Sequence, residues 1–218
     1  MTNYLIHACL EREWYVKEYL VPSMVAQGIK TGNINVYVDR KRDGCLKSFV
    51  ESGKLCTERG TWHLQDDVII SQHFKERTEQ YDNGIVCGFT CRYDKVPKPG
   101  LTKSKEEMWW SFPCIRIPDN IMNEFVTWAD TDMWTNPEYE RYVSAKKYDD
   151  YMFKVFLEKY YNNYEVLNLS PNLVDHIDFL LGGSVVNKQR RMPDVRSIYW
   201  NEEDLVKKLA RELRNKKF

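Results

Sequence analysis

The sequence predicts an α/β fold, with one domain of 218 residues built on a mainly parallel central sheet that is flanked by helices. In the first half, short apolar runs rich in β-branched and aromatic residues alternate with longer segments of helical periodicity. This alternation requires crossover connections, and crossovers join parallel strands. Hydrophobic residues make up 43% of the chain and aromatic residues 14%, which is enough for one core.

The elements of the first half follow this alternation in order. We expect strands at residues 4–10, 34–38, 61–65 and 85–90. We expect helices at residues 11–27, 46–55 and 68–80, the first of them stopped by Gly28.

The second half opens with a charged segment that contains two prolines and a glycine, which predicts a long loop at residues 92–107. A helix is expected at residues 119–129, and a longer one at residues 137–161. The segment YEVLNLSPNLVDHIDF is strand-like, and residues 201–218 predict a final amphipathic helix. That tail carries six cations, interpreted either as a solvated helix face or as a contact for nucleic acid or membrane.

Composition restricts the class of protein. Lysine plus arginine equals aspartate plus glutamate at 32 each, which argues against a strongly basic nucleic-acid platform. The six cysteines form no CxxC pair, so free thiols in a reducing compartment are expected. The N-terminus becomes charged too early for a signal peptide, and no window reaches the roughly 18 apolar residues of a membrane span. We therefore expect a cytoplasmic protein.

Two adjacent aspartates, Asp66 and Asp67, interrupt the apolar run TWHLQDDVIISQHF. Burying an unpaired charge costs several kcal/mol, so they should face water, a helix N-terminus or a cation at the end of an element. Asp39 ends the preceding strand, and ligands of such sheets bind beyond the carboxyl ends of the strands. We expect the three carboxylates along one crevice. The alternatives are a cap for a helix that begins near Val68 and, for Asp39, a turn-forming role.

A carboxylate pair beside such a crevice is suited to Mn²⁺ or Mg²⁺ bound against a diphosphate, because hard cations prefer oxygen ligands. The metal would neutralise charge on a leaving diphosphate. In this context the chain resembles nucleotide-sugar-dependent glycosyltransferases of the GT-A fold, in particular small bacterial or phage-like ones. The resemblance spans most of the chain and is carried by Arg12 after the first strand, VYVD, LQDD in place of the DxD motif, KKYDDYMFKVFLE, and DHIDFLLGGS. Gln65 occupies the first position of the acidic motif.

This resemblance implies a GT-A-like, Rossmann-like sheet and assigns the metal to Asp67 and His176. A core histidine is the alternative for His176, and Asp175 or Asp178 could orient the ring. It implies a nucleoside-diphosphate sugar, expected to be a UDP-sugar, as the donor. Residues 1–91 would form the nucleotide-sugar-binding half and residues 92–200 the acceptor and catalytic half.

Donor contacts are expected from four residues. Asp66 would bind the ribose or a metal-bound water, and Asp39 the base or ribose. Arg12 is the third candidate, with a solvated arginine as its alternative. Arg191, beside Arg190 and Arg196, would hold the diphosphate, and a solvated charge run is the alternative.

The acceptor side centres on Asp150, the expected catalytic base, with Asp149 as its alternative. Both could instead be early-helix acids that favour the helix dipole. Trp109, Trp110 and Phe112 are expected either to line the acceptor pocket or to pack in the core.

The predicted function is metal-dependent transfer of a sugar to a hydroxyl, with inversion. The acceptor stays open among a glycan, a protein, a lipid-linked sugar and a hydroxymethylated DNA base. A sugar-nucleotide nucleotidylyltransferase and a non-catalytic binding module are the alternatives, although YLIHACLERE lacks the glycine-rich loop of the former. A phage-encoded enzyme acting in the host cytoplasm fits this reading.

Overall fold

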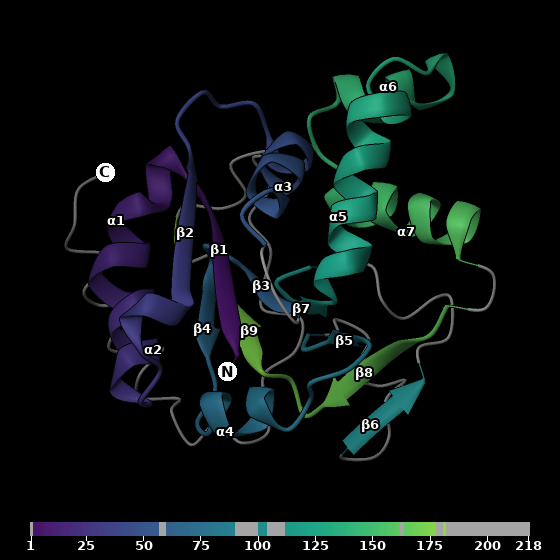
Figure 1. Cartoon of the computed structure of the whole chain (residues 1–218). Coiled ribbons are helices and arrows are strands. Elements are labelled where there is room, and N and C mark those ends of the chain that lie inside the picture. The colour runs from purple at the N-terminus through teal and green to yellow at the C-terminus, as the bar shows by residue number, and fades with distance from the viewer. Residues whose placement is uncertain are drawn as a thin grey trace.

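The computed structural model describes residues 2–56, 60–89, 100–103, 112–161, 164–177 and 181. They form a seven-stranded sheet in the order β2-β1-β3-β7-β5-β8-β6 and a two-stranded sheet, β4-β9 (Figure 1). The large sheet comprises β1 Asn3–Cys9, β2 Ile34–Asp39, β3 Thr61–Gln65, β5 Ile85–Cys87, β6 Gly100–Lys103, β7 Cys114–Ile117 and β8 Val166–Ser170; the small one comprises β4 Val68–Ile70 and β9 Val174–His176.

The expected α/β class is confirmed, with a sheet that is mixed. Strands β2, β1 and β3 are parallel to one another, and β5 is parallel to β8. Strand β7 runs antiparallel to both β3 and β5, and β6 antiparallel to β8. Both halves of the chain therefore contribute to one sheet, as a single domain requires.

Helices cover the opposite faces of this sheet (Figure 1), with a hydrophobic core between each face and its helices. The first lies under a helical segment made of η1 Leu10–Arg12, α1 Glu13–Tyr15, η2 Val16–Leu20 and α2 Val21–Ala26, and also includes Phe74 of α4 Phe74–Glu79. The second lies under α3 Cys45–Gly53, α5 Asp119–Trp128 and α7 Asp149–Tyr160. The helix expected from residue 11 is confirmed, and the chain turns after it at Gly28, where φ is +83°.

The strand order places a switch point between β1 and β3. The chain passes from β1 to β2 on one side and then returns to β3 on the other side of β1. Crevices for ligands form outside the carboxyl ends of strands at such a point. The end of β1 and the acidic turn after β3 therefore lie where the fold favours a binding site.

The expectation of a helix from residue 68 is wrong. Residues Val68–Ile70 form β4, which pairs antiparallel with β9, and α4 begins only at Phe74 after His73 in a left-handed conformation. The run VII is short, β-branched and buried, and its partner strand is distant in sequence, so local periodicity could not separate the two structures.

The long helix expected at residues 137–161 is also interrupted. It consists of η6 Pro137–Tyr139, α6 Glu140–Ser144 and α7, separated by a turn in which Lys146 and Tyr148 have positive φ. Because of this break, Asp149 and Asp150 are the first residues of α7 rather than mid-helix residues. The loop expected at residues 92–107 is wrong for Gly100–Lys103, which pair with β8 as β6.

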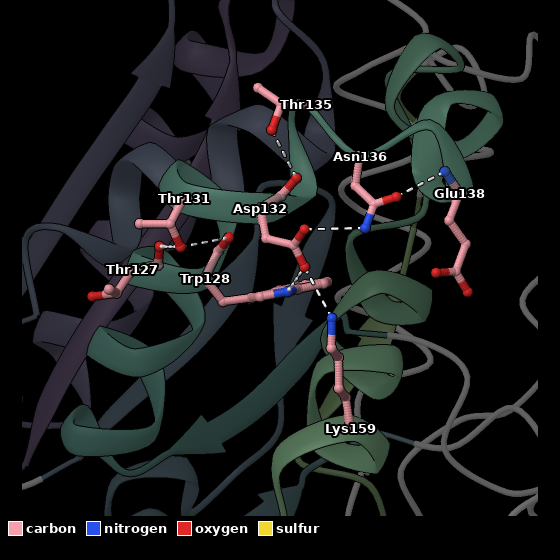
Figure 2. A network of polar contacts seen from close by, with 8 residues as sticks. All are labelled: Thr127, Trp128, Thr131, Asp132, Thr135, Asn136, Glu138 and Lys159. Carbon is pink, nitrogen blue, oxygen red and sulfur yellow. Dashed lines mark hydrogen bonds and ion pairs between the residues drawn. The ribbon is translucent and has the colours of Figure 1, made fainter.

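A polar network fixes α7 against the end of α5 (Figure 2). Asp132, in η5 Ala129–Met133, accepts hydrogen bonds from Trp128 Nε1 at 3.0 Å, Asn136 Nδ2 at 3.0 Å and Lys159 Nζ at 2.9 Å. Asn136 in turn accepts from the backbone N–H of Glu138 at 3.0 Å. One carboxylate thus joins three helical segments, and this holds in place the helix whose first turn carries the second acidic pair.

The described cysteines, Cys9, Cys45, Cys56, Cys87 and Cys114, are free thiols, as expected. None of the helices in the described ranges combines the length and apolarity that crossing a bilayer requires.

Candidate functional site

The acidic pair lies in the tight turn that joins β3 to β4, at the carboxyl end of β3. Asp66 Oδ2 accepts a hydrogen bond of 2.7 Å from the backbone N–H of Cys9, the last residue of β1. The pair therefore spans the switch point between the two strands. Since β4 rather than a helix follows, the helix-cap interpretation of these aspartates is wrong.

Arg12 is buried between the two carboxylates. Its Nη1 lies 3.0 Å from Asp66 Oδ1 and also forms an ion pair with Asp67 Oδ2. All three residues are 5–6% exposed, so the interpretation of Arg12 as a solvated arginine is wrong. A buried cation beside two buried carboxylates offsets much of their desolvation cost.

The late histidine reaches the same turn. In the β4–β9 ladder His176 pairs with Val68, and its Nε2 lies 3.1 Å from Asp67 Oδ2. The backbone N–H of Ile177 donates to the carbonyl oxygen of Asp67 at 2.7 Å. The His176 side chain keeps 25% of its surface exposed, so it borders the site rather than lying within the core.

The two carboxyls of the turn differ in their electrostatics. Burial alone would raise the pKa of Asp67, but the charges of His176 and Arg12 outweigh it and hold that pKa below its usual range. Burial and the charge of Asp67 raise the pKa of Asp66. Asp67 Oδ1 is buried without a hydrogen-bond partner. This oxygen is the free ligand position of the turn.

The donor set of Asp67 and His176 fits Mn²⁺ or Mg²⁺ in part. A carboxylate and a neutral imidazole are competent ligands for Mn²⁺, and the orphaned oxygen of Asp67 can accept a cation. Among the described residues no group of three or more His, Cys, Asp or Glu side chains surrounds a common point. Catalytic Mg²⁺ sites often have only one or two protein carboxylates and complete their coordination with substrate phosphates and water. The residues present are compatible with that kind of site.

The second acidic pair approaches the first from the other half of the chain. Burial raises the pKa of Asp149, and the charge of Asp67 adds a smaller contribution to the rise. The thiol of Cys45, at the start of α3, donates to the carbonyl oxygen of Lys146 at 3.5 Å, and it lies close enough to Asp149 to offset part of that rise in pKa. Both acids also stand in the first turn of α7, where the helix dipole favours negative charge.

The carboxyl of Asp150 has a raised pKa. Burial, followed by the neighbouring charge of Asp149, raises the pKa of Asp150 to about 7. Its Oδ1 accepts a hydrogen bond of 2.7 Å from the backbone N–H of Tyr151. A carboxylate whose pKa lies near neutrality can take a proton and release it again at the working pH.

Asp39 lies at the same edge of the sheet, beside Cys9 in the β1–β2 register. Its carboxylate accepts hydrogen bonds from the backbone N–H groups of Asp43 at 3.0 Å and Gly44 at 2.9 Å. The turn-forming role is therefore confirmed, whereas the expected crevice shared with the acidic pair stays a prediction. Donor binding by Asp39 stays a prediction.

Three predicted site residues, Trp109, Trp110 and Arg191, lie outside the described residues. Phe112 is described: it is 3% exposed and packs against Phe49 and Phe153, so the core interpretation holds for it.

Sequence reasoning missed two neighbours of the second acidic pair. One is Cys45, which has no local signal because its contact with Asp149 is purely tertiary. The other is a group of three tyrosines, Tyr142, Tyr148 and Tyr151, whose rings lie 4.6–6.4 Å apart around the start of α7. Their signal was available in RYVSAKKYDDY, where tyrosines and cations flank the acids.

Comparison of the chain with protein-family models finds no matching family, and comparison with curated proteins finds no match. The functional argument therefore depends on the geometry of the site.

Proposed function

We propose that this chain is a glycosyltransferase that moves a sugar from a nucleoside-diphosphate sugar, such as a UDP-sugar, to an acceptor hydroxyl with inversion. One observation carries the proposal. Asp66–Asp67 and His176 meet at the carboxyl end of β3, and Asp149–Asp150 closely follow Lys146, which packs against Gly44 in the turn after β2. The resemblance of these motifs to those of GT-A glycosyltransferases supports the same activity.

On the donor side, Asp67 and His176 would hold the divalent cation. When bound, that cation supplies positive charge for the diphosphate of the donor. Arg12 keeps Asp67 ionised and fixed in the turn, so the carboxylate is preorganised before any ligand arrives. Asp66 accepts hydrogen bonds from the backbone of Cys9 and from Arg12, and we propose that it binds the ribose of the donor.

On the acceptor side, Asp150 removes the proton of the acceptor hydroxyl. The hydroxyl oxygen forms a bond to the anomeric carbon, while the bond from that carbon to the diphosphate breaks and its electron pair leaves with the nucleoside diphosphate. The proton passes to the Asp150 carboxylate. Burial, followed by the charge of Asp149, raises the pKa of Asp150 to about 7, which makes its carboxylate a stronger base near neutral pH.

A donor screen tests the proposal. Purified protein is incubated with a panel of nucleoside-diphosphate sugars and either Mn²⁺, Mg²⁺ or EDTA, and release of nucleoside diphosphate is measured. We expect turnover with one donor that EDTA abolishes and that Asp67→Asn lowers at least 100-fold. Asp130→Asn is the matched control, because Asp130 is half-exposed and pairs with Lys54 away from the site.

Donor binding is measured separately by thermal shift. A donor at 100 times its dissociation constant stabilises a protein by about 2.7 kcal/mol. Full activity in Asp67→Asn would contradict the proposal, and so would the absence of both turnover and thermal shift across the panel.

A further inference from the structure

The three tyrosines around the start of α7 form an open aromatic surface beside the proposed base. Tyr142 and Tyr151 lie 4.6 Å apart between ring centroids, and the hydroxyl of Tyr142 donates to that of Tyr151 at 3.1 Å. The ring centroid of Tyr148 lies 5.6 Å from that of Tyr142 and 6.4 Å from that of Tyr151, and 38% of the residue is exposed. We call these three residues the tyrosine surface.

The backbone is strained where it presents Tyr148. This residue has φ 77° and ψ 33°, and Lys146 two positions earlier has φ 54°. Bulky side chains avoid this left-handed region, where Asn and Gly are favoured. Strain of this kind persists where the surrounding structure holds it in place and it serves a site.

Tertiary contacts with the turn after β2 hold this strained segment. A Cβ at Gly44 would collide with the carbonyl oxygen of Lys146, so only glycine permits this approach. The thiol of Cys45 lies 3.5 Å from the same carbonyl oxygen. The segments 40–47 and 141–148 therefore meet at Gly44 and Lys146.

These two segments are rich in cations. They contain seven cations and one acid; the cations are Arg40, Lys41, Arg42, Lys47, Arg141, Lys146 and Lys147. Glu11 and Glu13, from outside the segments, pair with two of the arginines, and Asp43 pairs with Lys47. The two segments themselves carry six more cations than acids, and the neighbouring acids come from outside them: Glu11, Glu13, Asp39, Glu51, Asp149 and Asp150.

Cations also cover the tyrosines themselves. The Arg141 guanidinium lies 4.4 Å from the ring centroid of Tyr142, and Lys147 Nζ lies 5.0 Å from that of Tyr148. A hollow of about 290 Å³ at the turn after β2 is lined by Tyr37, Val38, three cations (Arg40, Lys41 and Lys47) and two acids (Asp43 and Glu51). Aromatic rings and cations thus lie together in the segments that meet at Gly44 and Lys146.

We propose that the tyrosine surface and these cations bind a single nucleic-acid strand, which is the acceptor. A base stacks on Tyr148, and the phosphates lie on the cations of segments 40–47 and 141–148. Aromatic platforms inside a cationic groove are the general means of holding single strands. A neutral glycan would need the rings but not the cations of the two segments.

The binding of the strand stands without the proposed function, whereas its role as acceptor rests on it. In that role a hydroxyl of the strand lies at Asp150, loses its proton to that carboxylate and gains the bond to the anomeric carbon, as nucleoside diphosphate leaves with the electron pair.

Fluorescence anisotropy with labelled 12-nucleotide DNA and RNA strands tests the binding. In 50 mM salt we expect saturable binding to at least one strand, weakening as salt is raised. The informative variant is Tyr148→Asn, which removes the ring but suits the left-handed backbone. Its melting temperature should equal or exceed that of the wild type, while its affinity falls five- to 100-fold.

Tyr160→Asn is the matched control, because Tyr160 is 51% exposed with Lys159 Nζ 5.4 Å from its ring centroid, at the other end of α7. Lys41→Gln and Lys146→Gln should each lower the slope of log affinity against log salt by about 0.7. Lys103→Gln, on the far edge of the sheet, should leave the slope unchanged.

The proposal is overturned if neither strand binds, if Tyr160→Asn weakens binding as much as Tyr148→Asn, or if dextran sulfate competes as well as the strand at equal charge. It is also overturned if a neutral oligosaccharide displaces the strand. Strand binding with the expected variant pattern, but no turnover of any donor, would reject the proposed function and keep the binding site. Turnover with an acceptor that is not a nucleic acid, without any strand binding, would reject the binding site and keep the proposed function.

Discussion

His176 Nε2 lies 3.1 Å from Asp67 Oδ2, although the two residues come from different halves of the chain. The contact exists because β9 pairs with β4, the strand that leaves the acidic turn. The pairing of β4 with β9 thus places the imidazole of His176 at the carboxyl end of β3. If Asp67 and His176 hold a divalent cation together, the consequences can be measured on each residue separately.

Replacing His176 by Asn should raise the Mn²⁺ concentration required for half-maximal donor turnover at least tenfold, because one of two protein ligands is lost. Metal titrations of nucleoside-diphosphate release check this. His73→Asn is the control, since His73 is exposed and its left-handed backbone suits Asn. An unchanged metal requirement in His176→Asn would remove this residue from the metal site.

The pH dependence of turnover should reflect Asp150. A base acts when deprotonated, and burial with the charge of Asp149 raises the pKa of Asp150 to about 7. We therefore expect kcat/KM to rise with pH up to about 7 and to level off above it. Asp150→Asn should lower kcat by about 10²–10⁴-fold.

The variant Asp149→Asn distinguishes the role of Asp149 from that of Asp150. Removing the like charge lowers the pKa of Asp150, so the rise of kcat/KM should move to lower pH while substantial activity remains. If Asp149→Asn abolishes turnover and Asp150→Asn only weakens it, the roles are reversed.

Local sequence patterns predicted the strands β1, β2 and β3 and the place of the first acidic pair, because each of these depends on a short run and its turn. They failed at Val68–Ile70, where pairing with the distant β9 decides the structure. They also failed at Lys146 and Tyr148, where contact with Gly44 breaks a helix whose side-chain spacing looks continuous. Both failures adjoin the site, since one brings His176 to Asp67 and the other makes Asp149 the start of a helix.

The raised pKa of Asp150 should make the stability of the protein depend on pH. The folded-state pKa of Asp150 is about 7, above its unfolded value. Between about pH 4 and pH 7 this carboxyl is ionised in the unfolded chain but still protonated in the folded one. The free energy of unfolding therefore falls as pH rises through that window. Asp150→Asn should therefore gain on the order of 1 kcal/mol at pH 8, or about 2–4 °C in Tm, and nothing near pH 4. Thermal melts at both pH values check this, and an equal shift at pH 4 would contradict it.

Arg12 should be essential for stability as well as for the site. Arg12→Ala leaves two buried carboxylates facing each other and should cost about 3–5 kcal/mol of unfolding free energy, measured by urea titration. Converting the partners as well, in Arg12→Met with Asp66→Asn and Asp67→Asn, should restore much of the loss, because no uncompensated charge remains. Arg40→Ala is the control, since its ion pair with Glu13 is exposed on the arginine side and worth about 0–1 kcal/mol. A triple variant no more stable than Arg12→Ala would show that packing around the guanidinium, rather than charge compensation, stabilises this turn.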